Sequence, residues 1–411
     1  MKPMGPIPAG FKERDGELVI GSKPARALVD EAGRTPLFIY SGDLIERRIS
    51  ELRDAMPKKL EINYAVKANP FAPLITHMRG RVDGFDIASS GELEVVKAAG
   101  IDPESVSFAG PGKRETELEA AITFGATLNC ESEREAAKSI AIGERLGIKP
   151  RIAIRVNPDF ELRGSGMKMG GGAKQFGIDS ERVVPLARRL IDSGVEWRGF
   201  HIYTGSQSLD ADAIVETQAN VLQLARKLTE EIGAKLPKLN MGGGFGIPYF
   251  HGDKPLDVRK IGAALGDEFS RLPSDYDETR FCVELGRYLV GEAGVYVTRI
   301  IERKESHGET FLITDGGLHH QLAASGNFGT VVRRNYPLAN VEKFGAPVQE
   351  VASVVGCLCT PLDRLGDKVE LPVCEEGDLF AIFCAGAYGA SASPSAFLGQ
   401  GAAGELLVLG S

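Results

Sequence analysis

Residues 60–70 read LEINYAVKANP, an apolar segment typical of a buried β-strand that ends in a single lysine, Lys67. Removing an ammonium group from water is costly unless the charge is paired or takes part in chemistry. A lysine just beyond a strand usually lays its alkyl chain over apolar surface and returns its charge to water. In the alternative, burial and neighbouring cations lower its pKa and make it an amine nucleophile. The residues at the other strand ends distinguish the two cases.

Strand-like segments recur along the chain, and amphipathic segments lie between them. The candidate strands are residues 60–66, 82–86, 105–109, 126–130, 150–156, 197–203, 238–241 and 280–284. Eight strands that alternate with helices favour a (β/α)8 barrel. Beyond residue 284 the segments are β-rich with little helix between them: GVYVTRIIERKE, ETFLITDGG, VQEVASVVGCLCT and GDLFAIFCAGAYG. We therefore expect an α/β fold, with the barrel over residues 34–287 and a mostly β domain formed by residues 1–33 and 288–411.

The composition argues against several classes of protein. The net charge of −8 over 411 residues argues against nucleic acid as the main partner. No apolar run reaches about 18 residues, and the N-terminus lacks the apolar core of a signal peptide. The six cysteines are scattered, and the pair Cys357 and Cys359 has no second pair at zinc spacing. We expect a cytoplasmic protein with no membrane partner, no disulfide framework and no metal site.

Polar or ionisable residues follow nearly every predicted barrel strand. In (β/α)8 barrels the active site gathers at the C-terminal ends of the strands. The residues expected there are Lys67, Asp86, Glu92, Arg155, Asn157, His201, Ser206, the glycines of NMGGGFG (240–246), Glu284, Gly286 and Arg287.

The glycine-rich loop could be a phosphate site or a plain tight turn. It lacks the spacing of a P-loop and of the Rossmann fingerprint. Its place after the seventh strand is the usual phosphate position of these barrels, and Ser206 and Arg287 could add a hydroxyl group and a charge. A phosphate site beside a buried lysine suggests pyridoxal phosphate (PLP) bound through Lys67.

The chain contains nine ordered motifs that become recognisable together: YAVKANP, FDIASSGE, RVNP, KQFGI, HIYTGSQ, GGGFG, ELGR, CTPLD and GAYG. From about residue 34 to residue 390 it resembles the fold-type III PLP-dependent decarboxylases, the family of diaminopimelate and ornithine decarboxylases. The resemblance implies an alanine racemase-like architecture and a homodimer whose active sites are shared between subunits. It also implies a carboxy-lyase that removes the α-carboxylate of an amino acid through a Schiff base on Lys67 and a quinonoid intermediate.

The resemblance further implies a role for each motif residue. Lys67 would carry the cofactor, Glu284 would pair with the pyridine nitrogen, and His201 would stack on the ring. Asp86 and Arg155 would support the ring and the lysine. The phosphate would be held by Ser206, Gly243, Gly244, Gly286, Arg287 and Tyr388. Cys359 of the partner subunit would protonate the carbanionic carbon after CO2 has left.

A carboxylate at position 284 suits decarboxylation. A protonated pyridine ring accepts the electron pair that the departing carboxylate leaves behind, and Glu284 would keep the ring nitrogen protonated. Racemases of the related fold tend to place an arginine there instead.

The expected substrate-binding segments depart from the family pattern. Diaminopimelate and ornithine decarboxylases carry an acid directly after the cysteine, whereas this chain has Thr360, a poor partner for a distal ammonium group. The segment after the DGG of residues 315–317 is longer than in diaminopimelate decarboxylases. The candidate substrate contacts are His319, His320, Arg333, Arg334, Tyr336, Thr360 and Asp363.

These departures leave three readings open. The segments that depart from the pattern resemble those of the subgroup that acts on an amino acid tethered to an acyl-carrier protein. They also resemble those of the decarboxylases associated with exosortase and exopolysaccharide loci. A tethered substrate needs no acid for a distal ammonium group, which fits Thr360. The alternatives are a diaminopimelate decarboxylase of lysine biosynthesis and a non-catalytic regulator with the same fold. Such regulators tend to lose the lysine or the ring contacts, which are present here.

Overall fold

The computed structural model describes residues 1–164, 166–326 and 333–410, which form two compact units. The barrel unit comprises Ile49–Gly246 and Leu256–Gly286, and the β unit comprises Met1–Arg48, Ile247–Pro255 and Arg287–Ser411. Helix α2 (Gly42–Ala55) contains the first boundary between them.

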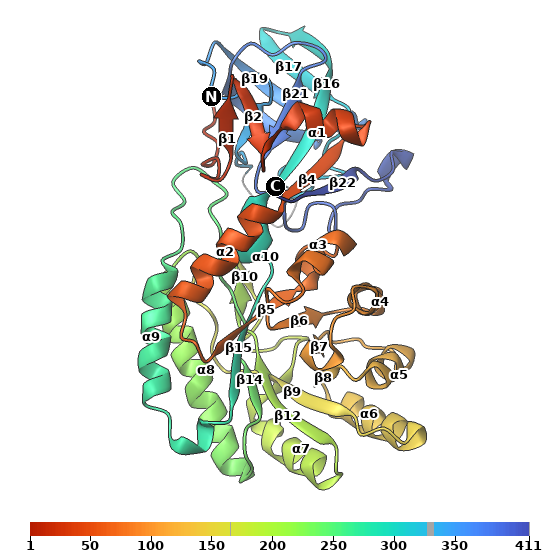
Figure 1. Cartoon of the computed structure of the whole chain (residues 1–411), viewed down its shortest axis with the longest axis vertical. Helices are drawn as coiled ribbons and strands as arrows, with labels where there is room; N and C mark the ends of the chain where they lie inside the picture. The colour runs from red at the N-terminus through yellow and green to blue at the C-terminus, as the bar shows by residue number, and fades with distance from the viewer. Residues whose placement is uncertain (165, 327–332, 411) are drawn as a thin grey trace. The chain divides into compact units, whose positions relative to one another are not determined.

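The barrel unit is a closed ring of eight parallel strands (Figure 1). Hydrogen bonds join β15 to β5 and β8 to β9, and these two pairings close the ring. The strands are β5 (Leu60–Ala65), β6 (Gly84–Ile87), β7 (Val106–Phe108), β8 (Thr127–Cys130), β9 (Arg151–Asn157), β12 (Glu196–Ile202), β14 (Lys238–Asn240) and β15 (Arg280–Leu285). Each overlaps a strand expected from the sequence, so the (β/α)8 prediction is confirmed. Shorter strands are β10 (Met167–Lys168), β11 (Ile178–Asp179) and β13 (Gly205–Ser206).

Helices connect the barrel strands, and their ends are marked by local sequence. They are α3 (Ala72–Met78), α4 (Ser90–Ala98), α5 (Glu115–Phe124), α6 (Glu133–Leu146), α7 (Ser180–Asp192), α8 (Ala211–Ile232) and α9 (Val258–Ser270). The Ser89 and Ser132 side chains accept hydrogen bonds from the first turns of α4 and α6. Gly125 and Gly233 end α5 and α8 in the left-handed conformation that glycine adopts without strain. Each helix returns the chain to the start of the next strand, so the C-terminal ends of all eight parallel strands lie on the same face of the ring.

The β unit is built around an eight-stranded sheet, as the mostly β prediction requires. The long strand β16 pairs with β4, β17 and β21. The strands of this sheet are β4 (Leu37–Ser41), β16 (Gly294–Ser306), β17 (Glu309–Thr314), β18 (Leu338–Asn340), β19 (Glu350–Val355), β20 (Arg364–Leu371), β21 (Leu379–Ile382) and β22 (Gly404–Val408). A small sheet precedes it, with β1 (Lys12–Arg14), β2 (Glu17–Ile20), β3 (Lys23–Pro24) and the helix α1 (Ala25–Ala32). The helix α10 (Arg287–Val290) precedes β16.

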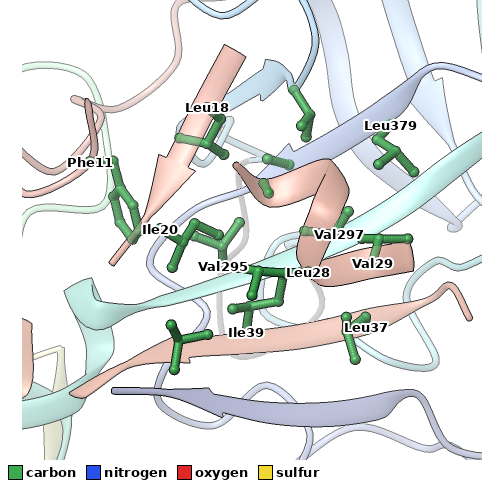
Figure 2. Packing of buried hydrophobic residues seen from close by; sticks show 14 of the residues in the cluster. Phe11, Leu18, Ile20, Leu28, Val29, Leu37, Ile39, Val295, Val297 and Leu379 are labelled. Carbon is green, nitrogen blue, oxygen red and sulfur yellow. The ribbon is translucent and has the colours of Figure 1, made fainter. Parts of the chain in front are cut away.

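Apolar side chains from both ends of the chain form the core of the β unit (Figure 2). Leu18, Leu28 and Ile39 come from the first 41 residues, while Val295 and Leu379 come from the C-terminal half. Strand β4 lies between β16 and β22 in this sheet. Residues 34–48 therefore belong to the β unit, whereas the sequence placed the barrel boundary at residue 34. A buried strand followed by a helix looks locally like a barrel repeat, and the pairing partners of β4 lie far along the chain.

No helix among the described residues is long and apolar enough to span a bilayer. In the same residues, no group of three or more His, Cys, Asp or Glu side chains is arranged to hold a metal ion. All six cysteines are free thiols.

Candidate active site

The buried Glu284 carboxylate belongs to the penultimate residue of β15, at the C-terminal end of that strand. Its Oε2 accepts a hydrogen bond from Asn240 Nδ2 at 2.9 Å and lies 3.0 Å from His201 Nε2. Burial by itself raises the pKa of this carboxyl group, but His201, Lys67 and Arg155 outweigh burial and lower the pKa to about 2. The lowered pKa favours the anionic form of Glu284, which is stabilised by His201, Lys67 and Arg155.

Asp86 is a second buried carboxyl group at this end, and it behaves differently. Ser107 Oγ donates a hydrogen bond to Asp86 Oδ1, while Oδ2 is buried without a hydrogen-bond partner among the described residues. Burial and the charge of Glu284 raise its pKa to about 6, against the lowering effects of Ser107, Lys238 and His201. Neighbouring acids with separated pKa values are typical of catalytic sites.

Lys67 follows β5 directly, in the short 3-10 helix Val66–Ala68. The side chain is half-buried, and Nζ lies 5.4 Å from the centre of the Tyr203 ring. Its charge opposes the effect of burial on the pKa of Glu92 and lowers the pKa of Glu284. Lys67 thus lies at the C-terminal end of its strand, within electrostatic range of Glu92 and Glu284.

Arg155 is held by a residue that the sequence analysis missed, Glu131. Arg155 Nη1 donates a hydrogen bond to Glu131 Oε1 at 2.7 Å, and both side chains are buried. Glu131 also accepts hydrogen bonds from the backbone N–H groups of Gly110 at 2.5 Å and Gly177 at 3.1 Å. The Arg155 guanidinium stacks 4.9 Å from the Phe176 ring. Glu131 directly follows β8, so the strand-end rule applied to the other strands would have identified it.

The glycine loop after β14 is a crowded backbone surface. A Cβ atom on Gly243 would lie 2.1 Å from the Glu284 carbonyl oxygen, and one on Gly286 would lie 2.7 Å from the Ala68 Cβ. Gly242 and Gly244 have φ angles of +68° and +87°, which favour glycine. Neither Gly243 in this loop nor Gly286 after β15 has room for a side chain. A backbone without side chains lets an anionic group such as a phosphate approach closely.

In the β unit, the Arg287 side chain lies between two tyrosine rings. Arg287 Nη1 donates a hydrogen bond to the Tyr249 hydroxyl oxygen at 2.7 Å, and its guanidinium carbon lies 4.6 Å from the Tyr388 ring centre. Nε is buried without a hydrogen-bond partner among the described residues. Tyr388 has a φ angle of +57°, which is uncommon for a non-glycine residue. Strained backbone of this kind often marks functional sites. Tyr249 was not predicted as a site residue.

The loop between β19 and β20 carries an exposed Cys359. Asp363 closes this loop from within, because its Oδ1 accepts from the Leu318 N–H at 2.6 Å and its Oδ2 accepts from the Leu358 N–H at 2.9 Å. The Asp363 side chain thus joins the two segments that were expected to contact substrate. Each of its carboxylate oxygens accepts one backbone hydrogen bond, so the side chain has a structural role, and its expected contact with substrate stays a prediction.

The other candidate substrate contacts are only partly accessible. His320 is buried, with Nδ1 at 2.9 Å from the Tyr296 hydroxyl group and Nε2 at 3.0 Å from the Gly401 carbonyl oxygen. Burial and then His319 lower the pKa of His320 to about 4, so the ring is neutral. His319 is also buried, and burial lowers its pKa.

Three further candidates lie beyond residues 327–332, which fall outside the described part of the chain. Tyr336 is buried and packs on Tyr249, with ring centres 4.7 Å apart. Arg334 lies 3.8 Å over the Phe250 ring, and Arg333 Nη2 donates to the Leu362 carbonyl oxygen at 3.2 Å.

Comparison with known proteins identifies the family. Residues 42–291 match the model of a family described as "pyridoxal-dependent decarboxylase, pyridoxal binding domain". The chain belongs to this family. It is 38% identical over 381 residues to L-glutamyl-(BtrI acyl-carrier protein) decarboxylase of Niallia circulans, covering 91% of this chain and 88% of that protein. It is 34% identical over 382 residues to diaminopimelate decarboxylase of Aquifex aeolicus, covering 92% and 87%.

A solved structure agrees with this assignment. The crystal structure of diaminopimelate decarboxylase from Helicobacter pylori complexed with L-lysine matches with a TM-score of 0.82 at 26% identity, covering 93% of this chain and 94% of that one. The protein is therefore a PLP-dependent amino-acid decarboxylase with the barrel and mostly β architecture of its relatives. The close-packed glycine loop after β14 and the buried Glu284 carboxylate are compatible with that cofactor.

Proposed function

We propose that this decarboxylase acts on an amino acid whose distal end carries no free ammonium group, specifically one tethered to an acyl-carrier protein. The loop of Cys359 carries the proposal. Thr360 offers a neutral hydroxyl group directly after the cysteine, and both oxygens of Asp363 accept backbone hydrogen bonds. The acid nearest in sequence to Cys359 on its C-terminal side is therefore Asp363, four residues on, and two backbone N–H groups hold its carboxylate in place.

Two observations on neighbouring residues support this proposal. His319 and His320 are buried with lowered pKa values, so neither contributes a charge near neutral pH. A relative that is 38% identical carries a name that specifies an L-glutamyl group on a carrier protein. A glutamyl thioester has one ammonium group, at the reacting carbon. It therefore needs no acidic side chain of the protein at its distal end.

Diaminopimelate decarboxylation is the second candidate. The relative from Aquifex aeolicus is 34% identical and is named for that substrate. This candidate needs a partner for the distal ammonium group, which Thr360 does not provide. Arg333 and Arg334, after residue 332, are the cations available for a distal carboxylate.

The proposed roles of the barrel residues come from the resemblance to the family, and the positions of these residues at the strand ends support them. Lys67 would hold the cofactor covalently, and Glu284 would pair with its ring nitrogen. His201 would lie against the ring, while Asp86 and Arg155 would support the surroundings of the lysine. When bound, PLP provides an electron sink for the pair of electrons that remains when the carboxylate leaves as CO2.

The proposed phosphate contacts are backbone and side-chain donors. They are Ser206, Gly243, Gly244, Gly286, Arg287 and Tyr388. The glycine N–H groups donate hydrogen bonds without adding bulk, and the Arg287 guanidinium adds a fixed charge.

The reaction takes up a proton at the carbon that loses CO2, and we assign its delivery to Cys359. The thiol is exposed in this chain, as a donor to a substrate must be. We further propose a cytoplasmic homodimer in which Cys359 of the partner subunit completes each site. We also propose that the barrel domain binds the cofactor and that the β-rich domain, made of both chain ends, completes the active site of the dimer.

Release of CO2 from a substrate panel tests this function. The panel contains free diaminopimelate, lysine, ornithine and glutamate, together with glutamate attached to a carrier protein as a thioester. Turnover of the tethered glutamate alone is the expected result. Efficient turnover of a free diamino acid, with none of the tethered substrate, would reject the proposal in favour of the second candidate.

A further inference from the structure

We propose that Asn240 is a positioning residue that holds the Glu284 carboxylate and the glycine loop in register with each other. Asn240 is the last residue of β14, and its side chain is buried. Nδ2 donates to Glu284 Oε2 at 2.9 Å, and Oδ1 accepts from the Gly242 N–H at 2.9 Å. One planar amide group therefore connects the proposed partner of the ring nitrogen, Glu284, with the glycine loop proposed to hold the phosphate. The inference rests on the role proposed for Glu284.

The chemistry of its partners fixes the orientation of this amide. The Gly242 N–H can only donate, so the amide oxygen faces it and the NH2 group faces the carboxylate. On the other side, His201 Nε2 lies 3.0 Å from the same Glu284 oxygen. Donors around a carboxylate favour its ionised form. Asn240 therefore helps to keep Glu284 a pure hydrogen-bond acceptor, as a partner of a protonated ring nitrogen must be.

Two substitutions of similar size separate the contributions of this amide. In Asn240→Asp, one oxygen keeps the contact with Gly242, but the other brings a second carboxylate against Glu284. Two carboxylates in contact do not both ionise freely, so the pair titrates together and holds a proton. In Asn240→Leu, both hydrogen bonds are lost, and the buried Gly242 N–H has no partner.

The surroundings of Asn240 offer a matched control. A small cavity of about 20 Å³ inside the barrel is lined by residues that include Asn63, Ser107, Asn129, Lys238 and Asn240. This volume admits about one water molecule. Asn129 Nδ2 has no hydrogen-bond partner among the described residues, so it donates no hydrogen bond to Glu284 there, whereas Asn240 does. Asn129→Asp thus adds the same charge to the same cavity without removing a hydrogen bond to Glu284.

The test measures the binding and the absorbance spectrum of PLP itself, with apoprotein of each variant. We expect Asn240→Leu to raise the Kd of PLP about tenfold, the effect of losing a hydrogen bond to a charged group. We expect Asn240→Asp to make the spectrum of bound PLP depend on pH around neutrality, through the shared proton. Asn129→Asp should retain the wild-type Kd and spectrum.

The other possible results would overturn either the positioning role of Asn240 or the role of Glu284 on which it rests. A wild-type Kd and spectrum in both Asn240 variants would overturn the inference, and so would an Asn129→Asp variant that behaves like Asn240→Asp. Glu284→Gln is measured alongside and should change the spectrum. A silent Glu284→Gln variant would reject the proposed role of Glu284, whereas silent Asn240 variants beside an altered Glu284→Gln would reject only the positioning role. If Asn240→Leu does not fold, Asn240→Asp carries the test.

Discussion

Asp363 accepts a hydrogen bond from the backbone N–H of Leu358, the residue directly before Cys359. Its second carboxylate oxygen accepts from the Leu318 N–H, one residue before His319. A Cβ atom on Gly317 or Gly356 would lie 2.2 Å from this carboxylate, so both backbones approach it closely. One buried side chain thus sets the relative position of two loops that the sequence marks as functional.

The first prediction concerns this carboxylate. Asp363→Ala leaves two backbone N–H groups unpaired and should lower the free energy of unfolding by about 2–4 kcal/mol. Turnover should fall as well, because the loop of Cys359 loses its anchor. Urea unfolding and CO2 release measure the two effects. Thr360→Ala, in the same loop, removes one exposed hydrogen bond of 3.3 Å from the Leu362 N–H to Thr360 Oγ1 and should lower the unfolding free energy far less. Equal losses in both variants would contradict the anchoring role.

The second prediction concerns substrate choice at Thr360. Thr360→Asp places an acid directly after the cysteine and should raise kcat/KM for a free diamino acid by about tenfold, through a charge-assisted contact with the distal ammonium group. Steady-state CO2 release with free and carrier-tethered substrates measures the change. The neutral isostere Thr360→Asn is the control. A gain of the same size in Thr360→Asn would show that charge is not the cause.

The third prediction concerns the buried pair Glu131 and Arg155. Glu131→Gln leaves the guanidinium buried without its counter-charge and should lower the free energy of unfolding by about 3–5 kcal/mol. The affinity for PLP should fall too, since Arg155 loses its fixed position. Glu119→Gln, which breaks the exposed pair with Arg145, is the matched control and should show no measurable change. Similar losses in both variants would argue against a special role for the buried pair.

The fourth prediction concerns the pH dependence of stability in the apoprotein. The pKa of Asp86 rises from 3.8 to about 6 on folding, so between these values the folded state binds more protons than the unfolded state. Its contribution to stability is therefore greatest below pH 3.8 and is lost as pH rises to about 6. The slope of this loss is at most about 1.4 kcal/mol per pH unit.

Asp86→Asn should abolish this slope, and Ser107→Ala should move it to higher pH, because the Ser107 hydrogen bond lowers the pKa of Asp86. Denaturant unfolding across this pH range measures both effects. Glu284, with a pKa lowered to about 2, contributes stability above its unfolded pKa of 4.5 and loses it as pH falls towards 2. An unchanged slope in Asp86→Asn would assign the pH dependence to other groups.

The fifth prediction concerns Lys67. Borohydride reduction of the PLP-loaded protein should attach the cofactor to Lys67, which peptide mass spectrometry locates. Lys67→Ala should bind PLP reversibly and show no turnover. Lys59→Ala, at the other end of the same strand, should keep covalent labelling. Labelling at another lysine in the wild-type protein would reject the proposed anchor.

The barrel was predictable from local sequence because each strand has its own apolar pattern and turn residues. Lys67, Asp86, Arg155, His201 and Glu284 could be found by one rule, that barrel sites form at strand ends. In the structure, the other four side chains lie within electrostatic range of the Glu284 carboxylate. Glu131 follows the same rule but was overlooked. Asn240 and Tyr249 were not predicted, because their importance depends on which atoms they meet.

The sequence by itself determined the order of the barrel strands, the motif residues at their ends and the family, since these depend on short-range pattern. Only the tertiary structure decided that β4 belongs to the β unit, because its partners β16 and β22 are remote in sequence. It also decided that Asp363 is an internal anchor, because a carboxylate binds whichever N–H groups the fold brings to it. Long-range contacts of this kind leave no local signature.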